Sequence, residues 1–196
     1  MKILNYSNFV WEWQWSYLFL VCDDPKQLDA TTFTCEDSGG FGTPCSNTYD
    51  GDESTVWTSG KNSYSWSQEA YRDGKAQWGY GTNVKIILSK ETIVSGVQIT
   101  NKVDETDFYE NYKGVELQFS NGYAKEVELA NGKQNPVTTL ETPVSTSFVN
   151  VFGISTWGAM PDDHFFLNSG HTGFRSGLSE IRVFGCEEGI AFKMTR

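Results

Sequence analysis

The sequence has few positive charges and lacks long apolar runs. Its 196 residues contain 15 Lys and Arg against 25 Asp and Glu, which leaves a formal net charge of −10. Such a field repels phosphate backbones, so nucleic acid is a poor candidate partner. No run of 18 or more apolar residues is present, so the sequence predicts no transmembrane segment.

Sequence signatures of common enzymes are also absent. There is no GxSxG, no HExxH and no phosphate-binding glycine loop, and His164 and His171 have no nucleophile nearby in the sequence. Acidic residues cluster between Asp104 and Glu110, which is more typical of a solvated surface than of a paired acid and base. We therefore predict that the chain is not an enzyme.

Zinc-site spacing is absent from the four cysteines, which form no CxxC pair. An even number of cysteines in an aromatic, glycine-rich chain indicates two disulfides and an oxidising compartment, with free buried thiols as the alternative. Three pairings are possible. We favour Cys35 with Cys45, which closes a local loop, and Cys22 with Cys186, which ties the two ends together.

The N-terminal part is rich in tryptophan. Between Phe9 and Val21, large apolar residues alternate with polar ones, which is the pattern of a half-buried strand. This strand either completes a sheet of its own domain or docks on another molecule. The segment Met1 to Val21 superficially resembles a signal peptide, but Glu12 and Gln14 interrupt its apolar core and no small-residue cleavage site follows, so we expect it to be retained.

Short alternating apolar runs recur from Val84 to Val183, and polar residues fill the positions between them. Asn121-Gly122 lies between two such runs and is a strong hairpin signal. No stretch has a 3.6-residue period over a dozen residues. The sequence therefore predicts an all-β fold, an antiparallel β-sandwich of jelly-roll type, with long loops that carry the function.

The segment from Ser46 to Ser59 reads SNTYDGDESTVWTS. Asp50, Asp52 and Thr55 surround Gly51, and a tight turn there can aim oxygen atoms at one point. Such a set of hard ligands suits Ca²⁺, although the spacing is not that of an EF-hand. The alternative is an Asp-Gly turn whose carboxylates are solvated.

The stretch from Tyr49 to Trp57 resembles the opening signature of galactose-binding-like domains, which include the coagulation factor V/VIII type C (discoidin) domains and the family 32 carbohydrate-binding modules. Further segments are similar to the family's motifs, in the same order along the chain: Gln77–Trp78 with Val84–Lys90, Thr92–Thr100, Gly114–Gly122 and Gly177–Gly185. The resemblance covers about Thr31 to Cys186. It divides the chain into an N-terminal extension (1–30), a β-sandwich (31–186) and a tail (187–196).

Many members of this family hold a structural Ca²⁺ between the first loop and the final strand. The resemblance implies that Asp50, Asp52, Thr55 and Glu180 are its ligands here, with backbone carbonyls near Asn47 and Thr55. Discoidin domains also join their two ends by a disulfide. Cys186 directly follows the last strand and fits that pattern, whereas the second cysteine pair departs from it.

The family's sugar-binding residues vary among members, so none of them carries over. Trp57 and Trp78 match positions that pack inside the sandwich. The remaining candidates are loop residues that can stack on a sugar or bond its hydroxyls, although each could equally be loop packing. They are Trp157, Trp66, Tyr109, His164, Asn168, His171 and Arg175.

Two functions follow from these features. The first is an extracellular, calcium-stabilised binding module that recognises carbohydrate or glycoconjugate in a lectin or adhesion role. The second is a structural subunit that docks on other chains through residues 9–21. Burial of Trp11, Trp13 and Trp15 inside the domain favours the first function, and their exposure to a partner favours the second.

Overall fold

The computed structural model describes most of the expected sandwich. The described residues are 22–40, 42–59, 71–72, 75–76, 82–102, 111–130, 134–157 and 176–186. The predicted strand from Phe9 to Val21 lies outside them, so the choice between its two roles stays a prediction. No helix within the described ranges is long and apolar enough to cross a membrane.

The described chain is almost entirely β-structure, with two short 3₁₀ helices and no α-helix among these residues. The strands are β1 (Lys26–Gln27), β2 (Thr34–Asp37), β3 (Trp57–Thr58), β4 (Tyr71–Arg72), β5 (Lys75–Ala76), β6 (Asn83–Asn101), β7 (Tyr112–Phe119), β8 (Ala124–Glu128), β9 (Thr138–Thr156) and β10 (Gly177–Cys186). The 3₁₀ helices are η1 (Ala30–Thr32) and η2 (Cys45–Thr48). The predicted all-β class is confirmed.

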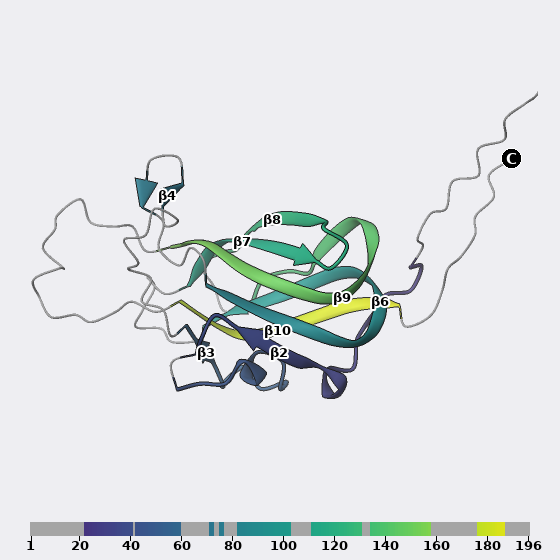
Figure 1. Ribbon diagram of the computed structural model, residues 1–196, viewed down its shortest axis with the longest axis horizontal. Helices are drawn as coiled ribbons and strands as arrows, with labels where there is room; N and C mark the ends of the chain where they lie inside the picture. The colour runs from purple at the N-terminus through teal and green to yellow at the C-terminus, as the bar shows by residue number, and fades with distance from the viewer. Residues whose placement is uncertain are drawn as a thin grey trace, which may run out of the picture.

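All of the recorded strand pairs are antiparallel. The main sheet has the order β1-β10-β6-β9-β7-β8, with β2 added to β6 and β3 to β10. The long strands β6 and β9 pair twice, first between Asn83–Ile87 and Phe148–Phe152 and again from Thr92 to Val97, with a register break between the two parts. The two strands bend there and contribute to both layers of the sandwich (Figure 1).

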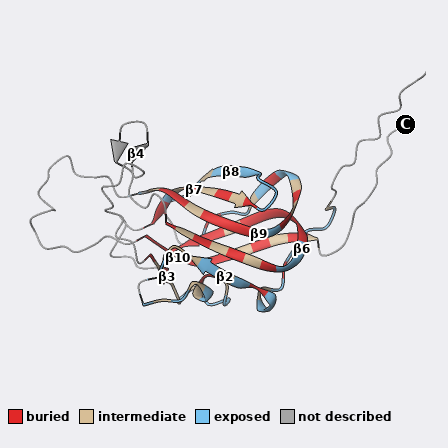
Figure 2. Ribbon diagram, viewed as in Figure 1, coloured by how far each residue is buried: buried red, intermediate tan, exposed pale blue. Residues whose placement is uncertain are grey.

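The core follows the alternation seen in the sequence. In β7, Val115, Leu117 and Phe119 are buried, whereas the intervening Glu116 and Gln118 are only partly buried. The first part of β6 alternates in the same way, whereas every residue of Thr92–Val97 in β6 and of Gly177–Ile181 in β10 is buried (Figure 2). Because burial of one large apolar side chain stabilises a fold by roughly 1.5–3 kcal/mol, these facing rows are the main source of stability.

Two disulfides close the fold, and both predicted pairings are confirmed. Cys22 is bonded to Cys186 with 5.7 Å between their Cα atoms, and Cys35 to Cys45 with 6.1 Å. Next to the first bridge, β1 pairs with the end of β10, and Leu28 packs into the core. The sandwich therefore includes residues that precede Thr31.

The β7–β8 hairpin is formed where Asn121-Gly122 predicted it. Gly122 has φ 84°, a left-handed conformation that costs glycine little. The Asn121 side chain accepts a hydrogen bond from the backbone N–H of Tyr123 (3.0 Å), and Phe119 pairs with Tyr123 across the turn. This turn sets the register that places Glu116 opposite Glu126 and Gly114 opposite Glu128.

Candidate functional site

Several strand ends meet at one end of the sandwich, where the predicted functional loops begin and end. Hydrogen bonds join these strand ends in pairs: Ser59 N–H to the Ser176 carbonyl (2.8 Å), Tyr112 N–H to Asn101 Oδ1 (3.0 Å), Trp157 N–H to the Asn111 carbonyl (2.9 Å) and Gly153 N–H to the Thr82 carbonyl (2.7 Å). The bases of three loops, between 59 and 82, 102 and 111, and 157 and 176, are therefore fixed relative to one another.

Most of the predicted sugar-contacting residues lie outside the described part of the chain, so their roles stay predictions. These residues are Trp66, Tyr109, His164, Asn168, His171 and Arg175. Trp157 is described, and it lies at this end of the sandwich directly after β9. It is the one predicted ligand contact whose surroundings the structure describes.

Trp157 is held in place but remains 36% exposed. Its indole Nε1 donates a hydrogen bond to the Leu129 carbonyl (3.0 Å), and its ring lies 5.2 Å from the ammonium group of Lys113. Leu129 is tied in turn to Lys113, because its N–H bonds the Lys113 carbonyl at 2.7 Å. These contacts hold the ring in place, and part of its surface stays accessible to solvent.

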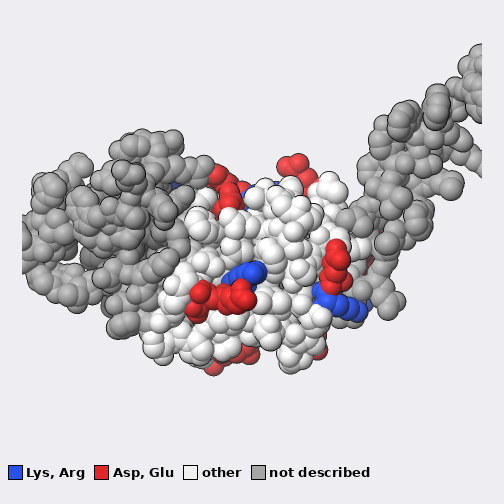
Figure 3. Space-filling view, viewed as in Figure 1, with Lys and Arg blue, Asp and Glu red and all other residues white. Residues whose placement is uncertain are grey.

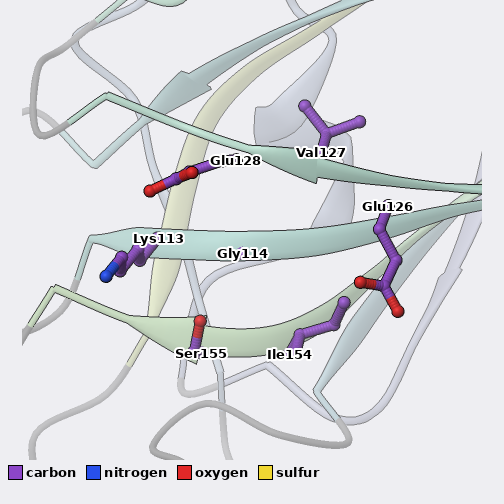
Figure 4. A pocket seen from close by; sticks show the side chains of 7 residues that line it. All are labelled: Lys113, Gly114, Glu126, Val127, Glu128, Ile154 and Ser155. Atoms are coloured by element: carbon purple, nitrogen blue, oxygen red, sulfur yellow. The ribbon is translucent and has the colours of Figure 1, made fainter.

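An open groove of about 470 Å³ lies beside this tryptophan, across the ends of β7, β8 and β9 (Figure 4). Gly114 lies at its centre. Its polar lining comes from Lys113, Glu126, Glu128 and Ser155, and its apolar lining from Val127 and Ile154. No sequence motif pointed to this groove. A glycine inside the alternating run KGVELQF was the available signal, but the cross-strand register was needed to place Glu128 and Ser155 beside it.

The loop after η2 brings several oxygen atoms together. The Thr55 hydroxyl oxygen lies 2.8 Å from Asp50 Oδ2, 2.9 Å from the Asp52 carbonyl oxygen and 3.3 Å from the Asn47 carbonyl oxygen. Because a hydroxyl group has one proton, it satisfies one of these three acceptors at a time. Gly51, with φ 82°, supplies the turn that folds the loop back on itself.

Glu180, on β10, faces this loop although it lies about 130 positions later in the sequence. It is only 2% exposed, and its Oε2 atom has no hydrogen-bond partner. The Gly51 N–H donates a hydrogen bond to its carboxyl group. Burial raises the pKa of Glu180 to about 7; Arg182 acts in the opposite direction, and the charge of Asp50 raises the pKa further.

The spacing of Asp52 suggested that its side chain points toward the same place as Asp50 and Thr55, but the side chain bonds Ser54 instead. Its Oδ1 atom accepts hydrogen bonds from the Ser54 N–H (2.9 Å) and hydroxyl (2.6 Å), and these bonds lower the pKa of Asp52. Its carbonyl oxygen, rather than its carboxylate, therefore faces Thr55. In the described ranges, no three Asp, Glu, His or Cys side chains come together as a metal cluster.

The oxygen set nevertheless fits a hard cation such as Ca²⁺, whose ligands in proteins are carboxylates, carbonyls and hydroxyls. The residues present are two carboxylates, Asp50 and Glu180, with the carbonyls of Asn47 and Asp52 and the Thr55 hydroxyl. An unpartnered carboxylate oxygen at 2% exposure is costly by itself, and a cation removes that cost. Glu53 bonds Arg182 at 2.7 Å, which ties the loop to β10 a second time.

Charge on the described surface is scattered. On the face shown in Figure 3, acidic and basic side chains lie next to one another, with wide neutral areas between them. Lys85 pairs with Glu36 at 3.0 Å, and Lys26 lies 3.6 Å from Asp24. No extended basic patch is visible among the described residues of this face.

Comparison of the sequence with protein-family models and with curated proteins finds no match. Solved structures do match. The family 32 carbohydrate-binding module of NanJ from C. perfringens, solved with galactose, is 15% identical, with a TM-score of 0.59 over 82% of this chain and 99% of that chain. An F5/8 type C domain from Bacteroides fragilis is 12% identical, with a TM-score of 0.56 over 85% and 99% of the two chains.

Another match is the lectin-binding domain of lectinolysin, a His mutant complexed with Lewis b, which is 13% identical. Its TM-score is 0.51, over 78% of this chain and 92% of that chain. At these identities the likeness concerns the fold. The chain has the jelly-roll fold of this family 32 carbohydrate-binding module and this F5/8 type C domain.

Proposed function

We propose that the chain is a non-catalytic carbohydrate-binding module of an extracellular, oxidising environment and that Ca²⁺ stabilises it. The observation that carries the proposal is Trp157, an immobilised and partly exposed indole at the end of the sandwich where the loop bases meet. Proteins of the same fold support the proposal, because solved examples carry galactose, Lewis b or GalNAc-β-1,3-galactose.

The chemistry of sugar binding matches this surface. A pyranose ring has an apolar C–H face that gains from desolvation against an aromatic ring, and its hydroxyl groups need directional partners. Trp157 offers the ring, and its indole N–H is already satisfied by the Leu129 carbonyl, so stacking leaves no buried donor unpaired. The two disulfides support an oxidising environment, because such bonds persist mainly outside the cytosol.

Calcium has a structural role in this proposal. The cation would be held by Asp50, Glu180, the Thr55 hydroxyl and the carbonyls of Asn47 and Asp52. It would supply positive charge next to Glu180, whose ionisation the charge of Asp50 disfavours. The cation would thereby join the loop that carries Asn47 and Thr55 to strand β10, close to the buried Trp57.

A glycan array tests the recognition half of the proposal. We expect the purified chain to bind a restricted set of glycans in calcium and to bind them less well after prolonged treatment with a chelator. If the calcium-loaded chain binds no glycan on an array of broad composition, the carbohydrate-binding function is wrong. Melting curves with and without the chelator test the calcium half independently of any ligand.

A further inference from the structure

The groove beside Trp157 belongs to the same surface as the tryptophan. Ser155 is the second-last residue of β9, and Trp157 directly follows the strand. Lys113 joins the two features, because its side chain lines the groove while its ammonium group lies 5.2 Å from the centre of the indole ring. A ligand on Trp157 therefore has the groove directly next to it.

Gly114 keeps the groove open. A Cβ atom at this position would lie 2.9 Å from Ser155 Oγ, which would have to rotate away, and in ordinary contact with Ile154 Cβ at 3.6 Å, so an alanine would occupy the floor of the groove. The pairing of β7 with β9 shifts register on both sides of Gly114. Glycine within a strand weakens it, and such glycines often occur at bulges or where another group approaches the backbone closely.

Four polar side chains surround this glycine in Figure 4: Lys113, Glu126, Glu128 and Ser155. They provide an ammonium donor, carboxylate acceptors and a hydroxyl group within one groove, and Ile154 adds apolar surface. A volume of about 470 Å³ lies within the range of small-molecule sites. Mixed polar and apolar lining at this scale suits a sugar ring, which has faces of both kinds.

We propose that this groove is a second sugar subsite, so that the module binds a neutral oligosaccharide chain with one ring on Trp157 and the next ring over Gly114. The inference rests on the proposed function, because it extends the ligand from the tryptophan onto the outer face of β7, β8 and β9. It predicts recognition of a chain of rings rather than of a single terminal sugar.

Charge selects neutral sugars over acidic ones. Glu116 and Glu126 are direct cross-strand neighbours, and Glu128 lies two residues along the same strand and face. Lys113 is the one basic residue of the groove lining, and its ammonium group lies beside the tryptophan. Carboxylates accept hydrogen bonds from sugar hydroxyls but repel the carboxylate of a uronic acid. An acidic oligosaccharide therefore meets like charge in the groove.

Isothermal titration calorimetry with defined sugars tests the subsite. The probes are neutral gluco-, galacto- and manno-oligosaccharides of one to four rings, together with galacturonic acid oligomers as the acidic counterpart. We expect the affinity for the best neutral series to rise at least tenfold from one ring to two. The acidic series is expected to bind at least tenfold more weakly than neutral chains of equal length.

Groove variants then separate the two subsites. In a Glu126→Gln, Glu128→Gln double variant, the gain from the second ring should shrink to less than threefold, while the affinity for a single ring stays within twofold of wild type. Gly114→Ala should have the same effect by filling the floor, with circular dichroism and melting curves to establish that it folds. Glu141→Gln, an exposed change on the first part of β9, is the matched control and should change neither value.

The outcomes distinguish this inference from the proposed function. Binding of a single ring as tightly as of two or more rings would overturn the second subsite and leave the carbohydrate-binding function intact. An undiminished gain from the second ring in both groove variants would also overturn it. Failure of the wild type to bind any of the probes would overturn the second subsite as proposed, and only a failure on the glycan array as well would overturn the carbohydrate-binding function.

Discussion

Trp57 and Trp157 make the same kind of hydrogen bond in very different surroundings. The indole N–H of Trp57 donates to Asp37 Oδ2 at 2.9 Å, and that of Trp157 donates to the Leu129 carbonyl at 3.0 Å. Trp57 is fully buried, whereas 36% of Trp157 is exposed. Both indole rings are held by a hydrogen bond, and the two residues differ in how much of their surface is exposed to solvent.

This difference indicates that the two tryptophans have different roles, one in stability and one in recognition. Trp57 directly follows the loop that carries Asp50 and Thr55, so the buried tryptophan and the proposed calcium ligands belong to one structural unit that packs against β10. Trp157 borders an open groove and contributes little to the core. Changes near Trp57 should therefore affect folding, and changes near Trp157 should affect recognition.

The largest expected effect is that of Trp57→Ala. Removal of a fully buried indole should lower the free energy of unfolding by about 3–5 kcal/mol. Trp157→Ala removes one hydrogen bond, worth about 1 kcal/mol, an exposed cation–π contact of about 0.5–1 kcal/mol and the burial of only part of a ring, so we expect a smaller loss than for Trp57→Ala. Urea denaturation of both variants measures the difference. Equal losses of unfolding free energy in the two variants would mean that Trp157 is also part of the core. The contrast between the two tryptophans would then be wrong.

The next effect concerns calcium. A ligand that binds only the folded state stabilises it by RT ln(1 + [L]/Kd), or about 2.7 kcal/mol at a hundredfold excess over Kd. We expect the wild type to melt at a higher temperature in calcium than in a chelator, and Asp50→Ala to lose this difference. Asp24→Ala, a change at an exposed aspartate outside the loop, serves as the control. Identical melting temperatures of the wild type in both conditions, after exhaustive chelation, would contradict the site.

The pH dependence of the calcium-free protein follows from Glu180. Burial raises its pKa from 4.5 to about 7, so the folded state binds this proton more tightly than the unfolded state does. The resulting stability is fully present below pH 4.5 and is lost as the pH rises through about 7. Melting temperatures in a chelator should fall over this range in the wild type, and the fall should be smaller in Glu180→Gln. A wild-type profile identical to that of Glu180→Gln would show that Glu180 does not titrate in this way.

Much of the fold could be predicted because strand alternation and cysteine number are local signals. Val115, Leu117 and Phe119 lie on the buried face of β7 as their spacing indicates. The pairing of Cys35 with Cys45 and of Cys22 with Cys186 also followed from the positions of the four residues. The alternation depends on one strand at a time and the Cys35–Cys45 bridge on one loop, so neither needs knowledge of the register; once that bridge is assigned, Cys22 and Cys186 are the pair that remains.

The sites could be predicted only in part, because they depend on contacts between strands. Asp50 and Thr55 lie in one loop and are close together, but the Asp52 side chain bonds Ser54 locally, which a count of carboxylates cannot show. The groove was missed for the same reason. Its residues come from three strands, and a bulge at Gly114 sets which of them share a face.

The smallest expected change in free energy is the loss of glycan affinity in Trp157→Ala. It tests most directly whether Trp157 acts in recognition and Trp57 in stability. Trp157→Ala should lower the affinity for the glycan selected by the array at least tenfold, or ~1.4 kcal/mol, because the apolar face of the sugar loses its stacking partner. Trp157→Phe keeps a ring but loses the bond to Leu129, so it should bind with intermediate affinity. Tyr123→Ala is the matched control, since Tyr123 is also 36% exposed but lies beyond the opposite end of β7, on the β7–β8 turn. A loss of affinity in Tyr123→Ala, with none in Trp157→Ala, would move the sugar site to the hairpin end of the sandwich and leave the loop-bearing end without a role in recognition.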